Sequence, residues 1–370
     1  MAVRLTGRLD GAGSAADANK NRLVHRRALF FTAPHRVQLR DEPLPAPAAD
    51  QALVETEVSA LSAGTELLAF RGQLPGDLVA DETLGALVDA TFRYPFRYGY
   101  ASVGIVRDVG AGVDRELVGR RVFAFQPHAS AFVAPAGELA MVPADLPSER
   151  AVLYPHMETA VNLILDGAPG LGDAVLVIGQ GVIGLLTTAL LARFPLGLLA
   201  AAETTPARAE RARSWGARAI VDSAAQWTAL AGARGADLVF ELSGNPDALA
   251  LAIGVAGHEA RVVVGSWYGD KRAPLDLGGR FHRRRLQLIS SQVSHIGASL
   301  SARWDRARRR ETTWRALAEI DTAPLISHRF SLEEAQRAYE LADAGGGASI
   351  QTGERGGDAL QILLTRAAIS

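Results

Sequence analysis

The chain has 370 residues, of which 48% are hydrophobic and 21% charged, and its formal net charge is −1. This balance is typical of a globular protein with two domains or one long one, and it creates no overall field that would attract nucleic acid or an anionic membrane. Because the chain has no cysteine, disulfides, thiolate nucleophiles and zinc sites built on sulfur are excluded.

The first 26 residues mix glycine, alanine and charged residues, and they lack the apolar segment that a secretory signal contains. We expect this stretch to form a flexible extension. We also expect the protein to be cytoplasmic.

The region 27–150 is predicted to form the first part of a mostly antiparallel and barrel-like β domain. Its apolar runs are short and separated by Pro, Gly and Asp, and residues 52–58 (ALVETEV) alternate between apolar and polar. Such alternation buries one face of a strand and leaves the other in water. No long helix is predicted here. The segment from Gly72 to Pro95 is expected to be a loop that shapes the mouth of a substrate site.

The region 151–292 alternates apolar strands with helices, which indicates an α/β fold with a doubly wound parallel sheet covered on both faces. This is the arrangement of a Rossmann nucleotide-binding domain. The predicted helices cover 149–166, 182–194 and 206–216, and the predicted strands cover 173–179, 196–203, 217–222, 236–244 and 260–267.

The region 293–370 is expected to return to the first domain, which would make that domain discontinuous. A basic helix over 302–320 precedes a strand over 324–330 and a helix over 331–343. Ser331 and Glu334 form a predicted capping box at the start of that helix. A Gly-rich loop then leads to a closing strand over 360–364.

Arginines are concentrated at 283–285 and in the basic helix over 302–320. Both groups are predicted to be exposed, the helix with Asp305 and Glu311 as partners. A substrate clamp at 283–285 is the alternative. No aromatic platform or RNA-binding motif accompanies these arginines, so we expect no nucleic-acid partner.

The run AVLVIGQGVIGLLTTALLA, residues 174–192, has no charged residue and is long enough to span a membrane. Its pattern favours a nucleotide site instead, because Gly179, Gly181 and Gly184 stand at GxGxxG spacing directly after a β-branched apolar run. One glycine permits the sharp turn, one lets the backbone approach a pyrophosphate, and one lets helix and strand pack closely. Amides at the start of the next helix, at Val182 and Ile183, would hold the phosphates.

Glu203 ends the next predicted strand, about 20 residues after the glycines, as dinucleotide sites require. Its carboxylate would accept the ribose hydroxyls and repel the extra phosphate of NADP, so NAD is favoured. Arg208 is the counter-argument, since a nearby arginine accommodates that phosphate, although an exposed helix face explains it as well. Ser243, Val264 and Gly265 end predicted strands and would border the nicotinamide.

Three stretches and the order of the parts resemble the medium-chain dehydrogenase/reductase superfamily from residue 27 to the end. SAGTE followed by GYASVG resembles a subgroup that includes bacteriochlorophyllide a dehydrogenase. The resemblance implies a GroES-like catalytic domain, a small alcohol or carbonyl substrate and a homodimer formed through edge strands of the nucleotide domain. The stretches are LSAGTELLAFRG (61–72), GYASVGIVRDVGAGVD (99–114) and GDAVLVIGQGVIGLLTTALLARF (172–194).

Zinc-binding members of the superfamily carry three ligands that this chain lacks at the matching positions. Ala63 stands where the family has a cysteine, and Gly99-Tyr100-Ala101 stands where it has Gly-His-Glu. The third ligand falls near Pro155. The resemblance therefore implies a member without zinc. A rebuilt metal site from Glu66, His128 and His156 is the alternative, although no ligand spacing recurs.

Zinc in this family stabilises the alkoxide during hydride transfer, so other groups must hold the oxyanion and move a proton here. Thr65 matches the family's proton-relay hydroxyl, and Tyr100 occupies the position of the lost histidine. Glu66 and His156 are further candidates. Each has a structural alternative, namely a turn hydrogen bond for Thr65, core packing for Tyr100, an ion pair for Glu66 and a helix-end position for His156.

Three functions are compatible with the sequence. The first is an NAD-dependent, zinc-independent dehydrogenase or reductase that acts on alcohols or ketones. The second is an NADPH-dependent quinone or enoyl reductase of the same fold, against which Glu203 argues. The third is a nucleotide-binding scaffold or sensor without turnover, because a fold alone does not prove activity.

Overall fold

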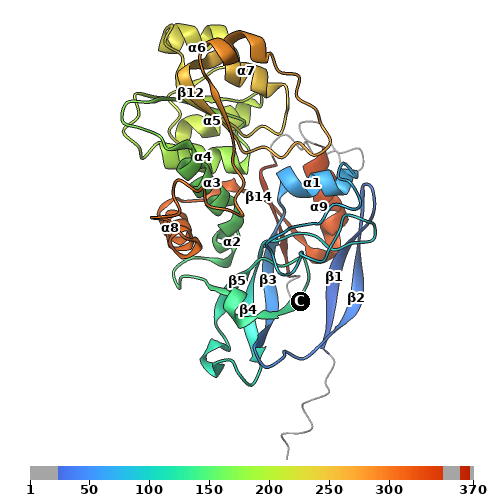
Figure 1. Ribbon diagram of the computed structural model, residues 1–370. Coiled ribbons are helices and arrows are strands. Elements are labelled where there is room, and N and C mark those ends of the chain that lie inside the picture. Colours follow the sequence, from blue (N-terminus) through green and yellow to red (C-terminus); the bar gives the residue numbers. More distant parts are fainter. Residues whose placement is uncertain (1–23, 345–358, 367–370) are drawn as a thin grey trace, which may run out of the picture.

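The computed structural model describes residues 24–344 and 359–366, which form a parallel sheet, a mostly antiparallel sheet and a two-stranded ribbon, flanked by helices (Figure 1). The predicted N-terminal extension lies outside the described residues except for 24–26, and so does most of the Gly-rich loop before the closing strand. Within the described part, no helix has both the length and the apolar character needed to cross a membrane.

The six strands of the parallel sheet follow the order β10-β9-β8-β11-β12-β13. Val175 and Val177 of β8 pack with α3 (Tyr154–Gly167) on one face, whereas Leu176 and Ile178 pack with Trp227 of α6 on the other. Both faces are therefore covered, as the continuous apolar strands predict. The order reverses between β8 and β11, and ligands of such sheets bind in the crevice outside the carboxyl ends of the strands at this point. The strands are β8 (Ala174–Ile178), β9 (Leu198–Ala202), β10 (Ala219–Ile220), β11 (Ala236–Glu241), β12 (Ala256–Val264) and β13 (Gln287–Ser290), and the helices between them are α4 (Val182–Leu191), α5 (Pro206–Ser214), α6 (Ala224–Ala231) and α7 (Ala248–Val255).

The second sheet is mostly antiparallel and is organised around β3 (Gln51–Ala60), which pairs with β4, β6 and β15. Since β15 (Gln361–Thr365) is the closing strand, the chain returns to this sheet as predicted. A parallel partner, β14, lies on the other side of β15. The remaining strands are β4 (Ser102–Val109), β5 (Arg121–Ala124), β6 (Ala131–Pro135), β7 (Ala140–Met141) and β14 (Ile326–Ser331), with β1 (Val24–Ala33) and β2 (Arg36–Leu44) in the ribbon.

Two helices differ from the sequence prediction. No long helix is predicted before residue 150, but α1 (Ala63–Arg71) forms there beside α9 (Ala335–Asp343) (Figure 1). Its residues 66–70 are all buried, so the apolar run has no helical period. The helix predicted over 149–166 is two helices, α2 (Ser148–Ala151) and α3 (Tyr154–Gly167), because Pro155 fits the first turn of a helix but not its interior.

Both helices near the end of the chain have capped starts. The predicted capping box of Ser331 and Glu334 is present in the turn before α9. Asp305 caps α8 (Arg306–Glu319) by accepting from the Arg308 amide. These caps satisfy amides that a helix start leaves without partners.

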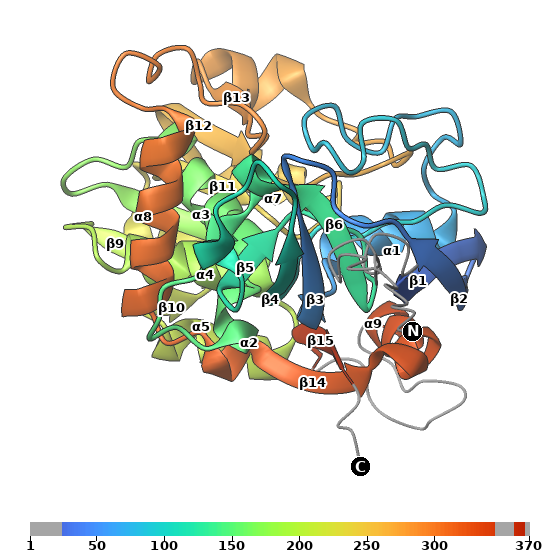
Figure 2. The same ribbon diagram turned by 90° about the horizontal axis from the view of Figure 1, so that it is seen from below.

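The basic helix α8 lies alongside α3 and buries one of its arginines (Figure 2). Arg309 is only 3% exposed, and its guanidinium donates to Glu158 Oε1 at 3.2 Å and to Asn162 Oδ1 at 2.8 Å. The prediction that all arginines of this helix are exposed is therefore wrong for Arg309. One face of α8 packs against α3, and on this face Arg309 forms a buried ion pair with Glu158.

One hydrophobic cluster joins the two sheets. It contains Val58 and Phe123 from the antiparallel sheet, Leu185 from α4, Leu317 from α8 and Leu363 from the closing strand. The nucleotide region and the β region therefore share a core rather than meeting across a polar boundary.

Candidate functional site

The glycine motif lies at the turn between β8 and α4, where two of its three glycines are closed in by protein. Gly179 has a φ of +87°, and a Cβ there would lie 2.6 Å from the Ser243 Cα. A Cβ at Gly184 would overlap the Gly179 carbonyl oxygen. At Gly181, by contrast, a Cβ would meet no atom within 4 Å. The first and third glycines serve packing, while the second faces open space.

Gly181 is also the N-cap of α4, and it offers no side chain to the first-turn amides at Val182 and Ile183. A helix start of this kind presents N–H groups and the positive end of the helix dipole. The combination of open space and unsatisfied donors fits a dinucleotide pyrophosphate.

Glu203 follows β9, directly beside the glycine turn. Its Oε2 accepts from the Gln180 amide at 2.8 Å, and its Oε1 accepts from the amides of Thr204 and Thr205 at 2.8 Å each. The carboxylate is thus held at the crevice and still has acceptor capacity for a hydroxyl. Arg208 is half-buried and turned elsewhere, because it donates to the Ala359 carbonyl at 2.8 Å.

At the other end of the crevice, β11 ends in Glu241, a buried carboxylate that the sequence analysis did not single out. It accepts from the Ser243 amide at 2.8 Å and from the Tyr268 hydroxyl at 2.5 Å, and Gly265 donates to its carbonyl at 3.0 Å. Burial, followed by the Glu241 carboxylate, raises the pKa of Tyr268. The predicted residues Ser243, Val264 and Gly265 therefore lie together here. Glu241 is the charged residue at the end of the apolar run ADLVFE, and this position was the signal that could have identified it.

Tyr100 and the start of α1 form a hydroxyl cluster in the β region. The Tyr100 hydroxyl donates to Ser62 Oγ at 2.5 Å. Burial and the nearby Glu66 charge raise the pKa of Tyr100 to about 12, against hydrogen bonds with Ser62 and Thr65. Tyr100 is therefore a protonated donor at neutral pH, and Thr65 lies beside it.

Glu66 is 1% exposed and forms an ion pair in the interior. Its Oε2 lies 3.0 Å from His128 Nε2 and also accepts from the Tyr339 hydroxyl of α9, while its Oε1 accepts from the Ser62 amide at 2.9 Å. Burial by itself raises the pKa of Glu66, but His128, the Tyr339 hydroxyl and the Ser62 amide together outweigh burial, and the pKa lies below its usual range. The Glu66 carboxylate is thus enclosed by its hydrogen-bond partners.

Position 99 must be glycine for this ion pair to exist. Gly99 has a φ of +102°, and a Cβ there would lie 2.5 Å from the His128 ring. The imidazole is fixed from its other side by Ser59, whose Oγ lies 2.8 Å from His128 Nδ1. The motif GYASVG therefore makes room for a histidine that the sequence analysis placed only in an alternative metal site.

His156 lies in the first turn of α3 and is 5% exposed. Its Nδ1 is buried and has no hydrogen-bond partner within the described residues. Burial lowers its pKa to about 4, although the Glu66 charge opposes the shift. Because the Glu66 charge acts on both Tyr100 and His156, the three side chains share one region of the molecule.

The positions that match zinc ligands in the family do not fit a zinc ion. Ala63 and Pro155 have no donor atom, and the Tyr100 hydroxyl is engaged with Ser62. The alternative metal site of Glu66, His128 and His156 does not form either, since residues 24–344 and 359–366 contain no group of three potential ligands. His128 has both ring nitrogens engaged.

The segment after α1 contacts residues that follow β12 in the nucleotide region. Leu87 and Phe92 are buried, and the Phe92 ring lies 6.4 Å from that of Trp267, which follows β12 in the nucleotide region. A Cβ at Gly269 would lie 3.0 Å from the Gln73 carbonyl. The segment from 72 to 95 thus meets the nucleotide region at the edge of the candidate site.

Known proteins with similar sequences are dehydrogenases. A family model described as zinc-binding dehydrogenase matches residues 182–310. L-threonine 3-dehydrogenase from Bacillus subtilis (strain 168) is 29% identical over 226 residues, which cover 57% of this chain and 59% of that protein. D-guloside 3-dehydrogenase from Escherichia coli (strain K12) is 24% identical over 309 residues, which cover 79% of this chain and 88% of the other. The chain thus spans less than two thirds of the Bacillus protein.

A solved structure of similar fold is an alcohol dehydrogenase from Escherichia coli CFT073 in complex with NADH. It superposes with a TM-score of 0.71 at 19% identity, over 92% of this chain and 99% of that one. The likeness shows a common fold. The sequence matches agree with the medium-chain dehydrogenase/reductase superfamily that the motifs resemble.

Proposed function

We propose that this chain is an NAD(H)-dependent oxidoreductase of the medium-chain type, which transfers a hydride between nicotinamide and the carbon of an alcohol or ketone. The observation that carries the proposal is the open space at Gly181, at the N-terminus of α4 and between two glycines that packing requires. Packing against neighbouring protein atoms does not require a glycine at position 181, so the glycine there leaves room for a ligand to approach the backbone. The names of the related dehydrogenases and the NADH-bound neighbour support the same reading.

The preference for NAD over NADP rests on charge. Three backbone amides hold the Glu203 carboxylate beside the glycine turn, where its charge would oppose a ribose phosphate. Arg208, which would welcome that phosphate, is engaged by the Ala359 carbonyl. The nicotinamide half would then lie near Ser243, Val264 and Gly265.

The cofactor, when bound, supplies or accepts the hydride, and the chain must hold the substrate oxygen and move its proton. Tyr100 is a protonated donor at neutral pH because its pKa is about 12. In reduction, the Tyr100 or Thr65 hydroxyl gives its proton to the substrate oxygen, which becomes the hydroxyl of the alcohol. In oxidation, the alcohol oxygen gives this proton back to the deprotonated side-chain oxygen.

His156 contributes a second donor in this proposal. Because its pKa is about 4, its ring is neutral at pH 7 and carries one proton. Its Nδ1 is enclosed without an acceptor, so we assign the proton to Nε2, which would stabilise the developing oxyanion. Glu66 acts through Ser62 as a positioning residue for Tyr100.

Zinc independence is part of the proposal, because the donor set at Ala63, Tyr100 and Pro155 does not suit that ion. We also propose that the chain belongs to the zinc-lacking subgroup that SAGTE and GYASVG resemble. We further propose a catalytic domain of 27–150 and 293–370, a nucleotide domain of 151–292, a homodimer through the edge of the parallel sheet, and a cytoplasmic location.

Cofactor titration and turnover test the proposal together. We expect NADH to bind more tightly than NADPH, and ketones to be reduced. Tyr100→Phe should lower kcat at least about 100-fold without weakening NADH binding, and Thr65→Ala should also lower the rate. Tyr94→Phe is the matched control, since that hydroxyl donates to the Ala69 carbonyl of α1.

The other outcomes select the alternatives. Tighter NADPH binding with turnover of enones would identify a quinone or enoyl reductase. Nucleotide binding without turnover of any alcohol, ketone or enone would identify a scaffold or sensor. An active enzyme indifferent to both substitutions would remove Tyr100 and Thr65 as proton donors.

A further inference from the structure

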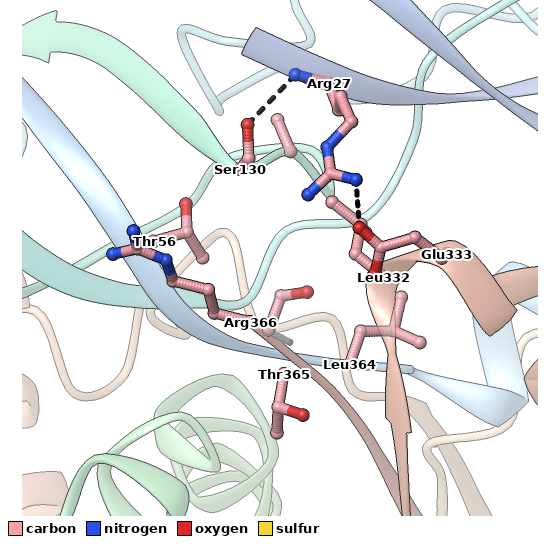
Figure 3. A pocket seen from close by; sticks show the side chains of 10 residues that line it. Arg27, Thr56, Ser130, Leu332, Glu333, Leu364, Thr365 and Arg366 are labelled. Carbon is pink, nitrogen blue, oxygen red and sulfur yellow. Dashed lines mark hydrogen bonds and ion pairs between the residues drawn. The ribbon is translucent and has the colours of Figure 1, made fainter. Parts of the chain in front are cut away.

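A polar pocket in the β region encloses about 970 Å³, including its open mouth, which is within the range of small-molecule sites. Its lining comes from β1, the turn before β3, the segment 72–95 and the end of β6. Figure 3 shows a much smaller hollow, where Arg27 of β1 pairs with Glu333. Arg26 lines the pocket and Arg27 lines the hollow, so the two lie on opposite faces of β1.

Two arginines of the pocket share one carboxylate. Arg26 donates to Glu42 Oε2 through Nε and Nη2, at 3.1 Å each, and Arg97 donates to the same oxygen at 3.4 Å. Burial and the Arg97 charge lower the pKa of Arg26, although Glu42 opposes the shift. One carboxylate cannot neutralise two guanidinium groups, so this end of the pocket carries excess positive charge.

Arg97 has donors to spare for a ligand. Its side chain is 39% exposed, and the long contact with Glu42 is its only side-chain hydrogen bond within the described residues. A guanidinium has five N–H donors, and a carboxylate can accept two of them side by side. The free donors of Arg97 are therefore suited to a second carboxylate, supplied by a ligand.

Gln126 is an independent indication of a ligand. It lines the pocket and is only 9% exposed. Among residues 24–344 and 359–366, its hydrogen bonds are made by its backbone alone, with the Ala124 carbonyl at 3.0 Å and the Ser102 hydroxyl at 3.2 Å. Polar side chains so deeply buried are normally hydrogen-bonded. The Gln126 amide thus offers the pocket a donor and an acceptor without a protein partner.

The rest of the lining restricts the ligand. Glu138 is the one acidic side chain among the described residues that line the pocket, and it would repel a second carboxylate on the ligand. Leu44, Pro127 and Val133 offer apolar surface to methylene groups. These features fit a ligand with one carboxylate and a short apolar body.

We propose that this pocket binds a small aliphatic monocarboxylate, whose carboxylate is held by Arg97 and Gln126 beside Arg26. Hydrogen bonds between guanidinium and carboxylate are among the strong ones in proteins, because both partners are charged. The site adjoins the Glu66 cluster of the β region, since His128 lines the pocket and its Nε2 lies 3.0 Å from Glu66 Oε2.

Calorimetric titration and thermal unfolding with butanoate, at constant ionic strength set by chloride, test the proposal. Butanoate should bind the wild-type protein and raise its Tm, whereas butanamide, a neutral analogue of the same shape, should do neither. Arg97→Gln should weaken butanoate binding at least about tenfold, because it removes a charged donor. Gln126→Leu should weaken binding at least about threefold without lowering the Tm of the free protein, since its amide has no protein partner.

Arg27→Gln is the matched control, because this neighbouring arginine faces the hollow in Figure 3 and pairs with Glu333. Butanoate binding that Arg97→Gln and Gln126→Leu weaken and Arg27→Gln preserves supports the proposal. The proposal is overturned if the wild type binds no butanoate, if butanamide binds equally well, or if the three variants have equal affinities. Loss of binding in Tyr100→Phe alone would place butanoate in the candidate site and also overturn it. These measurements need neither cofactor nor turnover, so they are independent of the proposed reaction.

Discussion

At the scale of single residues, the three glycines of the nucleotide turn have different physical roles, and two substitutions separate them. Gly184→Ala should destabilise the fold by about 3 kcal/mol, because its methyl group overlaps a backbone carbonyl. Gly181→Ala should change stability by less than about 1 kcal/mol, since a methyl group there meets nothing, yet weaken NADH binding at least about tenfold.

Urea unfolding and NADH titration of the same two proteins measure both effects. Gly184→Ala is the control for general damage to the turn. Wild-type NADH affinity in a well-folded Gly181→Ala protein would show that the pyrophosphate does not approach this position.

His156 should make stability depend on pH between 6.5 and 4. Its pKa is about 4 in the folded protein and 6.5 when unperturbed, so the unfolded chain binds a proton first as the pH falls. The stability associated with the neutral buried ring is complete above pH 6.5 and is lost as the pH falls toward 4. Between pH 7 and pH 5 the loss should be about 2 kcal/mol.

His156→Gln removes this titration, so its unfolding free energy should fall by about 2 kcal/mol less than that of the wild type over the same range. Urea unfolding at pH 7 and pH 5 gives the comparison. His258, an exposed histidine, provides the control in His258→Gln, which should keep the wild-type pH dependence. Parallel pH profiles for wild type and His156→Gln would contradict an enclosed neutral ring.

At the scale of elements, α8 is held to α3 by a buried ion pair that the basic sequence of the helix conceals. Arg309→Met should destabilise the protein by about 3 kcal/mol, because Glu158 is left buried without its partner. Arg310→Met, at the exposed neighbouring position, should change stability by less than about 0.5 kcal/mol. Thermal and urea unfolding distinguish the two.

The double variant Arg309→Met with Glu158→Leu gives a sharper comparison. Burial raises the pKa of Glu158, and Arg309 only partly opposes this effect. Without Arg309, the charged form of the buried carboxylate is therefore unfavourable. Removing both charges should recover part of the stability lost in Arg309→Met. A double variant less stable than the single one would show that shape, rather than charge, holds α8.

The sequence predicts elements whose burial has a regular period and misses those whose burial does not. The parallel strands are apolar on both faces and the capping box is a local pattern, so both are predicted correctly. The helix α1 is missed because residues 66–70 are buried without interruption. A strand of six residues is predicted over 217–222, but β10 has only two, because its pairing with β9 ends after Ile220.

The candidate site shows the same limit at the level of contacts. Local spacing is enough to predict the glycine turn, since its chemistry is contained in six consecutive residues. The Glu66 cluster depends on Tyr339, which lies far along the chain in α9, and on Gly99 making room for His128. No pattern within one element encodes such a meeting, so Glu66 and His128 could be grouped only as an alternative metal site and not as a hydrogen-bonded pair.

At the scale of the whole molecule, the shared core predicts that the two regions unfold together. Val58 and Phe123 of the antiparallel sheet belong to the same buried cluster as Leu185 of α4 and Leu317 of α8. Exposing either region would open this cluster to water and remove apolar burial from the other. We therefore expect one cooperative transition rather than the two that separate domains commonly show.

Calorimetry and urea unfolding followed by circular dichroism and by tryptophan fluorescence give the test. The transitions should coincide, and NADH should shift the whole curve, by about 2.7 kcal/mol at 100 times its Kd. Leu317→Ala opens a cavity in the shared cluster. It should lower the free energy of unfolding by about 3 kcal/mol, equally by both signals. Two transitions, of which NADH moves only one, would mean that the cluster does not couple the two regions, and that the β region folds independently of the cofactor.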